Sequence, residues 1–127
     1  MNKLRLGAAI LLALPLIVFG GNWFLNLFAL PEPQGAQAGL DLLQAMRDGG
    51  LMTWVSASHV AVGVCLLLPS LRFLGALLQL PLSLGIVAFH ATMLPEGLGL
   101  AIGMLALNAV VLMDAPRLRA LTAKLGD

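Results

Sequence analysis

Long apolar runs separated by short polar links dominate the chain. The runs cover residues 6–30, 51–68, 73–94 and 98–113. Because roughly 20 mainly apolar helical residues are needed to cross about 30 Å of hydrocarbon, each run predicts a membrane-spanning helix. The pattern therefore predicts an all-α fold, in which residues 1–127 form a single membrane domain built as a four-transmembrane-helix bundle.

The polar stretch between the first and second runs contains a short amphipathic segment. Pro31 stops the first run, and residues 36–48 place Leu40, Leu43 and Met46 at helical spacing. Acidic and amide side chains occupy the positions between them. This pattern predicts a short helix between the first two spans, lying on the membrane surface or capping the bundle.

The composition supports a membrane protein and excludes several other classes. Of the 127 residues 60% are hydrophobic and 10% are charged, whereas an ordinary soluble domain has roughly a quarter charged residues. This composition predicts the lipid bilayer as the partner of the chain. A net charge of +1 without a basic stripe argues against binding to nucleic acid. The single cysteine, Cys65, cannot form an intramolecular disulfide and is expected to be a small buried hydrophobe.

The distribution of basic residues predicts the orientation. If both termini are cytoplasmic, the inner side holds six of the seven basic residues, and only Arg47 lies outside. This split satisfies the tendency of basic residues to remain on the cytoplasmic side. The expected location is the bacterial cytoplasmic membrane, which is the inner membrane where there are two. The six inner residues are Lys3, Arg5, Arg72, Arg117, Arg119 and Lys124.

The two histidines of the chain both lie inside apolar runs. An ionisable residue within a spanning helix is costly and suggests a functional site. At 1.5 Å per residue, His59 lies about 12 Å and His90 about 6 Å below the outer end of its helix. Polar side chains of the first two spans reach similar depths, which predicts a pocket in the outer half of the bundle. The candidate ligand-binding residues are His59, His90, Asn22, Asn26, Ser56 and Trp23.

Catalytic and metal sites are not indicated by the residue pattern. The six acidic residues lie in links, at span ends or in the tail, so no buried acid completes a Ser–His–acid arrangement. Two histidines without a third protein ligand do not make a zinc site. We therefore assign no catalytic residue and no metal.

The fourth run carries features that suit contacts between helices. Gly99 and Gly103 form a small-xxx-small motif, which allows another helix to approach closely. Asn108 lies nearer mid-membrane, where an amide is expected to form hydrogen bonds between helices. The glycines predict a surface for assembly with a partner or with a second copy of the chain.

Three stretches resemble the DoxX-like family of small four-helix integral membrane proteins. The Gly20-Gly21-Asn22-Trp23-Phe24 end of the first run is similar to a Gly-x-Asn-Lys-Phe pattern of that family. The Pro-rich link with its amphipathic segment is also similar, as is Gly85-Ile86-Val87-Ala88-Phe89-His90 followed by Pro95-Glu96-Gly97. Trp23 stands where the family often has Lys, and His59 where it often has Glu. The resemblance implies a link to membrane redox systems, including quinone-reducing thiosulfate oxidation.

These observations leave three hypotheses open. In the first, a redox-associated oxidoreductase subunit binds a quinone or similar apolar small molecule, with His59 and His90 forming hydrogen bonds or relaying protons. A haem between the two histidines is a less favoured variant, because their depths differ by about 6 Å. The second hypothesis is a small-molecule or lipid transporter. The third is a non-enzymatic membrane assembly partner that docks through Gly99 and Gly103.

Overall fold

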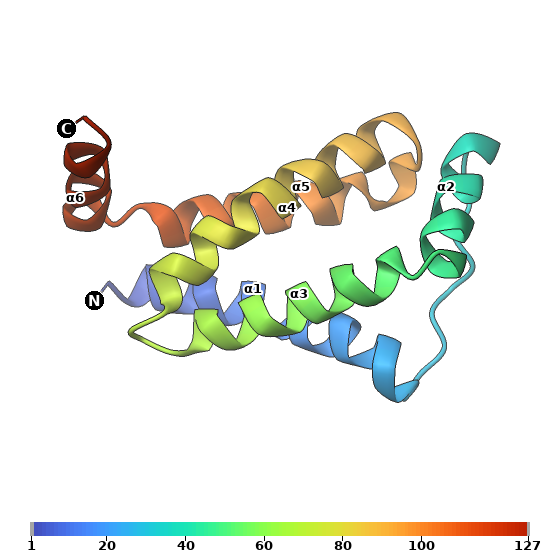
Figure 1. Ribbon diagram of the computed structural model, residues 1–127, viewed down its shortest axis with the longest axis horizontal. Coiled ribbons are helices and arrows are strands. Elements are labelled where there is room, and N and C mark those ends of the chain that lie inside the picture. The colour runs from blue at the N-terminus through green and yellow to red at the C-terminus, as the bar shows by residue number, and fades with distance from the viewer. Residues whose placement is uncertain (1, 127) are drawn as a thin grey trace.

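The computed structural model describes residues 2–126, and within this range the secondary structure is helical with no strands. Six α-helices and one 3-10 turn follow one another along the chain (Figure 1). The predicted all-α fold is thus confirmed for the described residues. The elements are α1 (Lys3–Leu25), α2 (Gln37–Asp48), α3 (Leu51–Leu67), α4 (Arg72–Thr92), η1 (Pro95–Gly97), α5 (Leu98–Leu112) and α6 (Ala115–Leu125).

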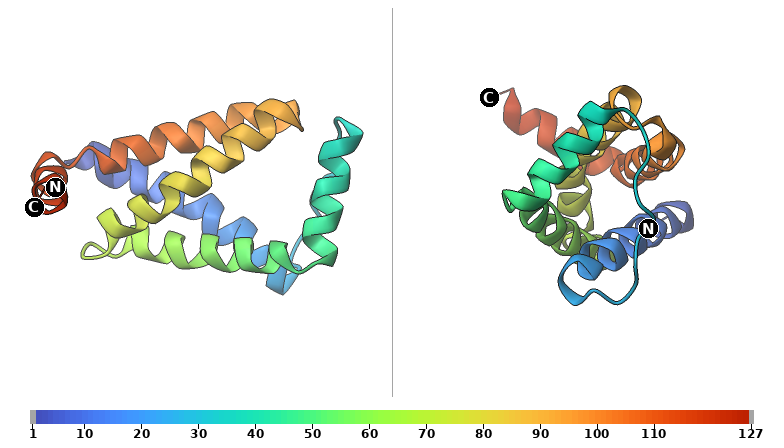
Figure 2. Two further views of the ribbon diagram at one scale, coloured as in Figure 1. Left: turned by 45° about the horizontal axis from the view of Figure 1, so that its top comes forward. Right: turned by 90° about the vertical axis from the view of Figure 1, so that its right-hand side faces the viewer.

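Four helices form the bundle and two lie across its ends. Helices α1, α3, α4 and α5 run along the long axis, with α2 across one end and α6 across the other (Figures 1 and 2). The start of α1 lies at the same end as α6. The structure therefore brings the two ends of the described chain to the same end of the bundle, as the predicted orientation requires.

Three helical stretches are long and apolar enough to cross a membrane: α1, α4, and η1 together with α5. Helix α3 has 17 residues and reaches the required length only when it is joined to α2, from which it bends by 82°. The bend falls at Gly49-Gly50, where Gly50 has φ of 81°, a backbone conformation that suits glycine. The structure thus contains three candidate spans, or four if α2 and α3 form one broken span.

One predicted boundary was wrong. The first run was expected to stay helical to residue 30, but α1 ends at Leu25 because Asn26 adopts a left-handed conformation with φ of 48°. The side chain of Asn22 then accepts the backbone N–H groups of Leu27 and Phe28. After residue 113, where no helix was predicted, the chain forms α6, whose first turn is capped by Asp114. By contrast, the amphipathic helix predicted at 36–48 is confirmed as α2.

Helices α1 and α3 pack closely because small residues face each other. A Cβ atom on Gly20 would lie 2.8 Å from the Ser56 carbonyl oxygen, and one on Gly63 would lie 3.2 Å from the Ala13 carbonyl oxygen. Such distances are too short for most side chains, so glycine is what permits the approach. Since lipid tails are as apolar as the helix surfaces, close packing of this kind drives association within a bilayer.

Helices α4 and α5 are joined by a buried amide. Asn108 of α5 is fully buried, and its amide, oriented to satisfy its neighbours, donates to the Ala76 carbonyl at 3.0 Å and accepts from the Leu80 N–H at 3.1 Å. Both groups belong to the turn of α4 that precedes Pro81, which has no N–H to donate. Asn108 therefore ties α5 to the turn that Pro81 interrupts, as its predicted interhelical role requires.

We predict opposite effects for two Gly→Ala substitutions. Gly20→Ala places a methyl group against the Ser56 carbonyl, so it should destabilise the bundle by about 1–3 kcal/mol. Gly103→Ala serves as the matched control, because nothing lies within 4 Å of its Cβ position and alanine favours helix more than glycine. Thermal unfolding in detergent should show a lower Tm for Gly20→Ala alone. Equal Tm values for both variants would contradict this account of α1–α3 packing.

Candidate functional site

A cavity of about 540 Å³ lies between the helices. This volume falls in the range of pockets that hold drug-sized molecules. Every helix except α6 contributes to its wall, and most of the lining side chains are apolar. The lining residues are Pro15, Leu16, Phe19, Leu43, Met46, Met52, Val55, His59, Pro81, Leu82, Gly85, Ile86, Phe89, His90, Leu100 and Met104.

His59 presents a buried nitrogen that the described residues leave without a partner. Its Nε2 is buried and forms no hydrogen bond within residues 2–126. On the α1 side, the Cβ of His59 lies 3.2 Å from the position of a Cβ on Gly20, so the close α1–α3 contact fixes the base of the side chain. An unsatisfied buried polar atom costs about 1–3 kcal/mol. A ligand that supplies a hydrogen-bonding group would recover that cost.

His90 is held in one orientation by its neighbours. Its Nδ1 lies 2.8 Å from the Leu94 carbonyl oxygen, and because a carbonyl only accepts, Nδ1 carries the proton. In the neutral ring Nε2 is then the acceptor. The ring occupies the space that a Cβ on Gly97 would need, and it contacts Phe89 edge to face at 5.3 Å between ring centroids. The His90 ring is therefore held in one orientation in the cavity wall.

Helix α2 closes the cavity at one end of the bundle. Leu43 and Met46 belong to the lining, and Figure 2 shows α2 lying across the ends of the other helices. A Cβ on Gly39 would lie 2.9 Å from the Met93 carbonyl oxygen, so α2 contacts the end of α4 at short range. Leu94, next in the chain, is buried and accepts the His90 hydrogen bond. The position of α2 is thereby coupled to that of His90.

The structure brings His59 and His90 to one cavity but does not bring Asn22 and Asn26 there. The Asn22 amide donates to the Phe28 carbonyl at 2.9 Å and accepts two backbone N–H groups, so its hydrogen bonds organise the loop after α1. Asn26 ends α1, and its side chain is exposed. The expected ligand-orienting role of these two residues has no support in this arrangement.

Ser56 and Trp23 also lie outside the cavity lining. Ser56 is buried at the α1–α3 contact, where its carbonyl faces Gly20. The Trp23 indole Nε1 donates to the Thr53 hydroxyl at 3.1 Å, which joins α1 to the start of α3. Both residues therefore help to position α3, and only the two histidines among the six candidates line the cavity.

Sequence analysis missed the apolar majority of the lining. The spacing of some of these residues along α3 does indicate that they face the cavity. Met52 and Val55 precede His59 by seven and four residues, so they share its face of the helix. Ile86 lies four residues before His90 in the same way. Any apolar side chain in a membrane helix could equally face lipid or a neighbouring helix, so the pattern alone could not single these residues out.

The arrangement is suited to binding an apolar molecule. No group of three His, Cys, Asp or Glu side chains within residues 2–126 is placed to hold a metal ion. The cavity lining is mostly apolar and includes two imidazole side chains, His59 and His90. This combination fits an apolar molecule that carries one or two hydrogen-bonding groups.

We predict that Gly97→Ala releases His90 from the Leu94 carbonyl, because the added methyl group would occupy the position of the ring. Nitrogen-15 spectra of histidine-labelled protein should show a proton on Nδ1 of His90 in the unchanged chain. The substitution should shift or broaden that signal. Gly99→Ala is the control, since nothing lies within 4 Å of its Cβ position. An unaltered His90 signal in Gly97→Ala would refute the proposed orientation.

Comparisons with known proteins identify no relative of this chain. No protein-family model, curated protein or solved structure matches it. The resemblance to the DoxX-like family thus rests on the residues quoted from the sequence, and its functional implications are proposals.

Proposed function

We propose that this protein is an integral membrane protein in which α1, α3, α4 and α5 each span the bilayer. The packing of the bundle supports this proposal, because α3 lies alongside α1 and α4. The 17 residues of α3 are also mainly apolar. At 1.5 Å per residue α3 is about 26 Å long, and a short span is accommodated by local thinning of the bilayer. Both termini are then cytoplasmic, and α2 lies in the outer interface.

The cavity is the binding site for an apolar small molecule, and the class we favour is a quinone. The observation that carries this proposal is that His59 and His90 both line a mostly apolar 540 Å³ cavity, and that the buried Nε2 of His59 has no hydrogen-bond partner within residues 2–126. A quinone combines an apolar ring and tail with two carbonyl oxygens that accept hydrogen bonds. His59 with its proton on Nε2 donates to one carbonyl.

His90 suits the reduced form of the same ligand. Because Nδ1 donates to Leu94, the neutral ring has only an acceptor to offer at Nε2. An acceptor pairs with the hydroxyl of a quinol and not with the carbonyl of a quinone. The two histidines together thus allow the cavity to hold either redox form, consistent with the redox-associated subunit that the DoxX-like resemblance implies. The protein's own part is binding and orienting the ligand.

A second candidate function is assembly with another membrane protein, which is favoured by the exposed face of α5. Gly99 and Gly103 are exposed, and nothing lies within 4 Å of either Cβ position. A helix of a partner redox subunit, or of a second copy of this chain, could pack closely against these glycines. This function is compatible with a quinone site, because the glycines lie outside the cavity lining.

We predict that His59→Ala weakens binding of a short-chain quinone by up to about tenfold, since a hydrogen bond contributes about 0.5–1.5 kcal/mol and about 1.4 kcal/mol corresponds to tenfold in affinity. The measurement is a titration of purified protein in mild detergent with a soluble ubiquinone analogue. His59→Gln should recover part of the affinity, because its amide can also donate.

Ser58→Ala is the matched control. Ser58 neighbours His59 on α3, but its hydroxyl donates to the Trp54 carbonyl of its own helix and it does not line the cavity. Its affinity for the quinone should equal that of the unchanged protein. Equal quinone affinity in His59→Ala and Ser58→Ala would contradict the proposed site.

A further inference from the structure

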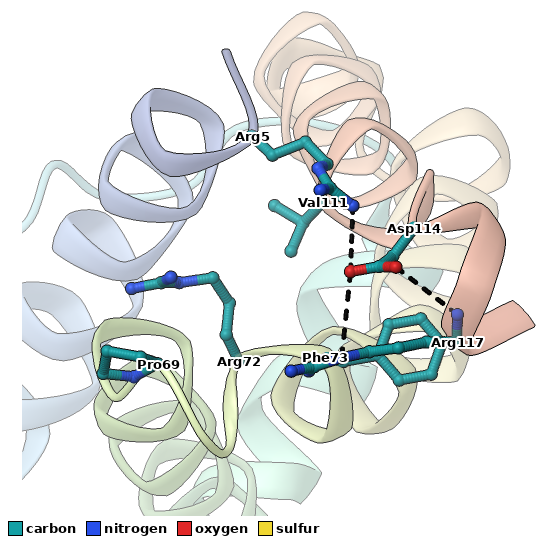
Figure 3. A pocket seen from close by; sticks show the side chains of 7 residues that line it. All are labelled: Arg5, Pro69, Arg72, Phe73, Val111, Asp114 and Arg117. Carbon is teal, nitrogen blue, oxygen red and sulfur yellow. Dashed lines mark hydrogen bonds and ion pairs between the residues drawn. The ribbon is translucent and has the colours of Figure 1, made fainter. Parts of the chain in front are cut away.

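A second pocket lies at the opposite end of the bundle from α2. It has a volume of about 260 Å³ and is formed where α1, the α3–α4 turn, α4, α5 and α6 meet (Figure 3). Three arginines and one aspartate line it, together with apolar side chains. The lining residues are Arg5, Pro69, Arg72, Phe73, Val111, Asp114 and Arg117.

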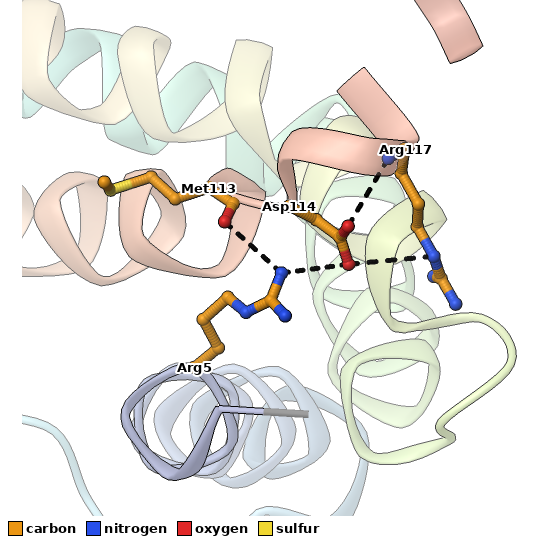
Figure 4. Close-up of polar contacts among 4 residues, drawn as sticks. All are labelled: Arg5, Met113, Asp114 and Arg117. Carbon is orange, nitrogen blue, oxygen red and sulfur yellow. Dashed lines mark hydrogen bonds and ion pairs between the residues drawn. The ribbon is translucent and has the colours of Figure 1, made fainter. Parts of the chain in front are cut away.

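Asp114 holds two of the arginines in place. One of its carboxylate oxygens lies 2.9 Å from an Arg5 guanidinium nitrogen and 3.8 Å from Nε of Arg117 (Figure 4). Arg5 also donates to the Met113 carbonyl at 3.3 Å, and the Arg117 guanidinium lies 5.9 Å from the centre of the Phe73 ring. These contacts join α1, α4 and α6 around one carboxylate and leave both guanidinium groups at the pocket wall.

Arg72 adds a third guanidinium that is mostly buried. Only 7% of its surface is exposed, and its side chain donates to the carbonyls of Leu66 and Leu67 at the end of α3. Arginine remains protonated in proteins. The three arginines and one aspartate of the lining therefore carry a formal charge of +2, so the pocket favours an anion.

Helix α6 places this pocket at a membrane surface. It lies across the end of the bundle (Figure 1), and its exposed side chains include Leu118, Leu121 and Leu125 as well as Arg119 and Lys124. A short helix with exposed leucines and basic residues is typical of one that lies in the interface and is attracted to anionic lipid. The pocket opens beside such a helix.

We propose that this pocket binds the phosphate group of an anionic phospholipid. The lipid belongs to the leaflet at the end of the bundle where α1 begins and α6 lies. Guanidinium groups form paired, charge-assisted hydrogen bonds with phosphate oxygens. Pro69, Phe73 and Val111 supply an apolar surface for the part of the lipid next to its phosphate. The inference rests on the proposed membrane embedding but is independent of what occupies the other cavity.

The apolar part of the lining favours a lipid over a soluble phosphate compound. A free phosphate ion would use only the arginines, whereas a phospholipid also buries carbon against Phe73 and Val111. Lipid and soluble phosphate share the same phosphate chemistry, so the test must separate them.

The test measures binding of phosphatidylglycerol to detergent-purified protein by native mass spectrometry, with phosphatidylcholine and inorganic phosphate as further probes. Arg117→Gln and Arg5→Gln/Arg117→Gln remove charges from the pocket. Arg119→Gln is the matched control, since it removes the same charge from α6 outside the lining. The double variant also removes the Arg5–Asp114 ion pair. If that loss disturbs folding, the single variant Arg117→Gln still tests the site.

We expect phosphatidylglycerol affinity to fall about tenfold in Arg117→Gln and further in the double variant, and to change less than about twofold in Arg119→Gln. His59→Ala should leave it unchanged, which separates this site from the quinone site. Equal losses in Arg117→Gln and Arg119→Gln would overturn the proposal, because the attraction would then be diffuse. Equal affinity for phosphatidylcholine, or for inorganic phosphate, would overturn it as well.

Discussion

The close approach of α1 to α3 is the contact on which the rest of the structure depends. A bilayer provides little hydrophobic driving force between helices, so association needs close packing and satisfied polar groups. Gly20 and Gly63 permit that packing. The same contact places Gly20 against the base of His59, so the interface that holds the bundle together also positions the histidine in the cavity wall.

Polar side chains at the edges of this contact support the same geometry. Asn22 satisfies the backbone where α1 ends, and Trp23 donates to Thr53 at the start of α3. On the other side of the bundle, Asn108 joins α5 to α4 beside Pro81. Between these two helix pairs lies a cavity that close packing within each pair leaves unfilled. The cavity thus arises from the same packing that stabilises the bundle.

The two ends of the bundle carry different chemical groups. At one end α2 contributes Leu43 and Met46 to an apolar cavity that contains two imidazoles. At the other end α6 brings Arg117 to a cationic pocket organised by Asp114. We propose an apolar ligand for the first site and a lipid phosphate for the second. A lipid at the second site would contact Arg5 of α1 and so stabilise the end of a helix that also lines the first.

The apolar runs and their spacing were sufficient to predict the helical class and the amphipathic helix α2. They also showed that both histidines lie within apolar helices. It could not reveal the role of Asn22, because an amide that ends a helix and one that faces a ligand look alike in sequence. No helix was predicted after residue 113, because that segment contains no long apolar run. The pairing of Arg5 with Asp114 joins residues 109 positions apart, and such contacts follow only from the packing of the bundle.

The most direct test of the proposed cavity site is photolabelling with a photoreactive quinone, followed by peptide mapping. Met46, Met52 and Met104 line the cavity, whereas Met113 lies near the other end of the bundle and is 71% exposed. We expect the label on the three cavity methionines, and an excess of unlabelled quinone should prevent this labelling. Label confined to Met113 and other lipid-facing positions, or label that unlabelled quinone does not displace, would contradict it.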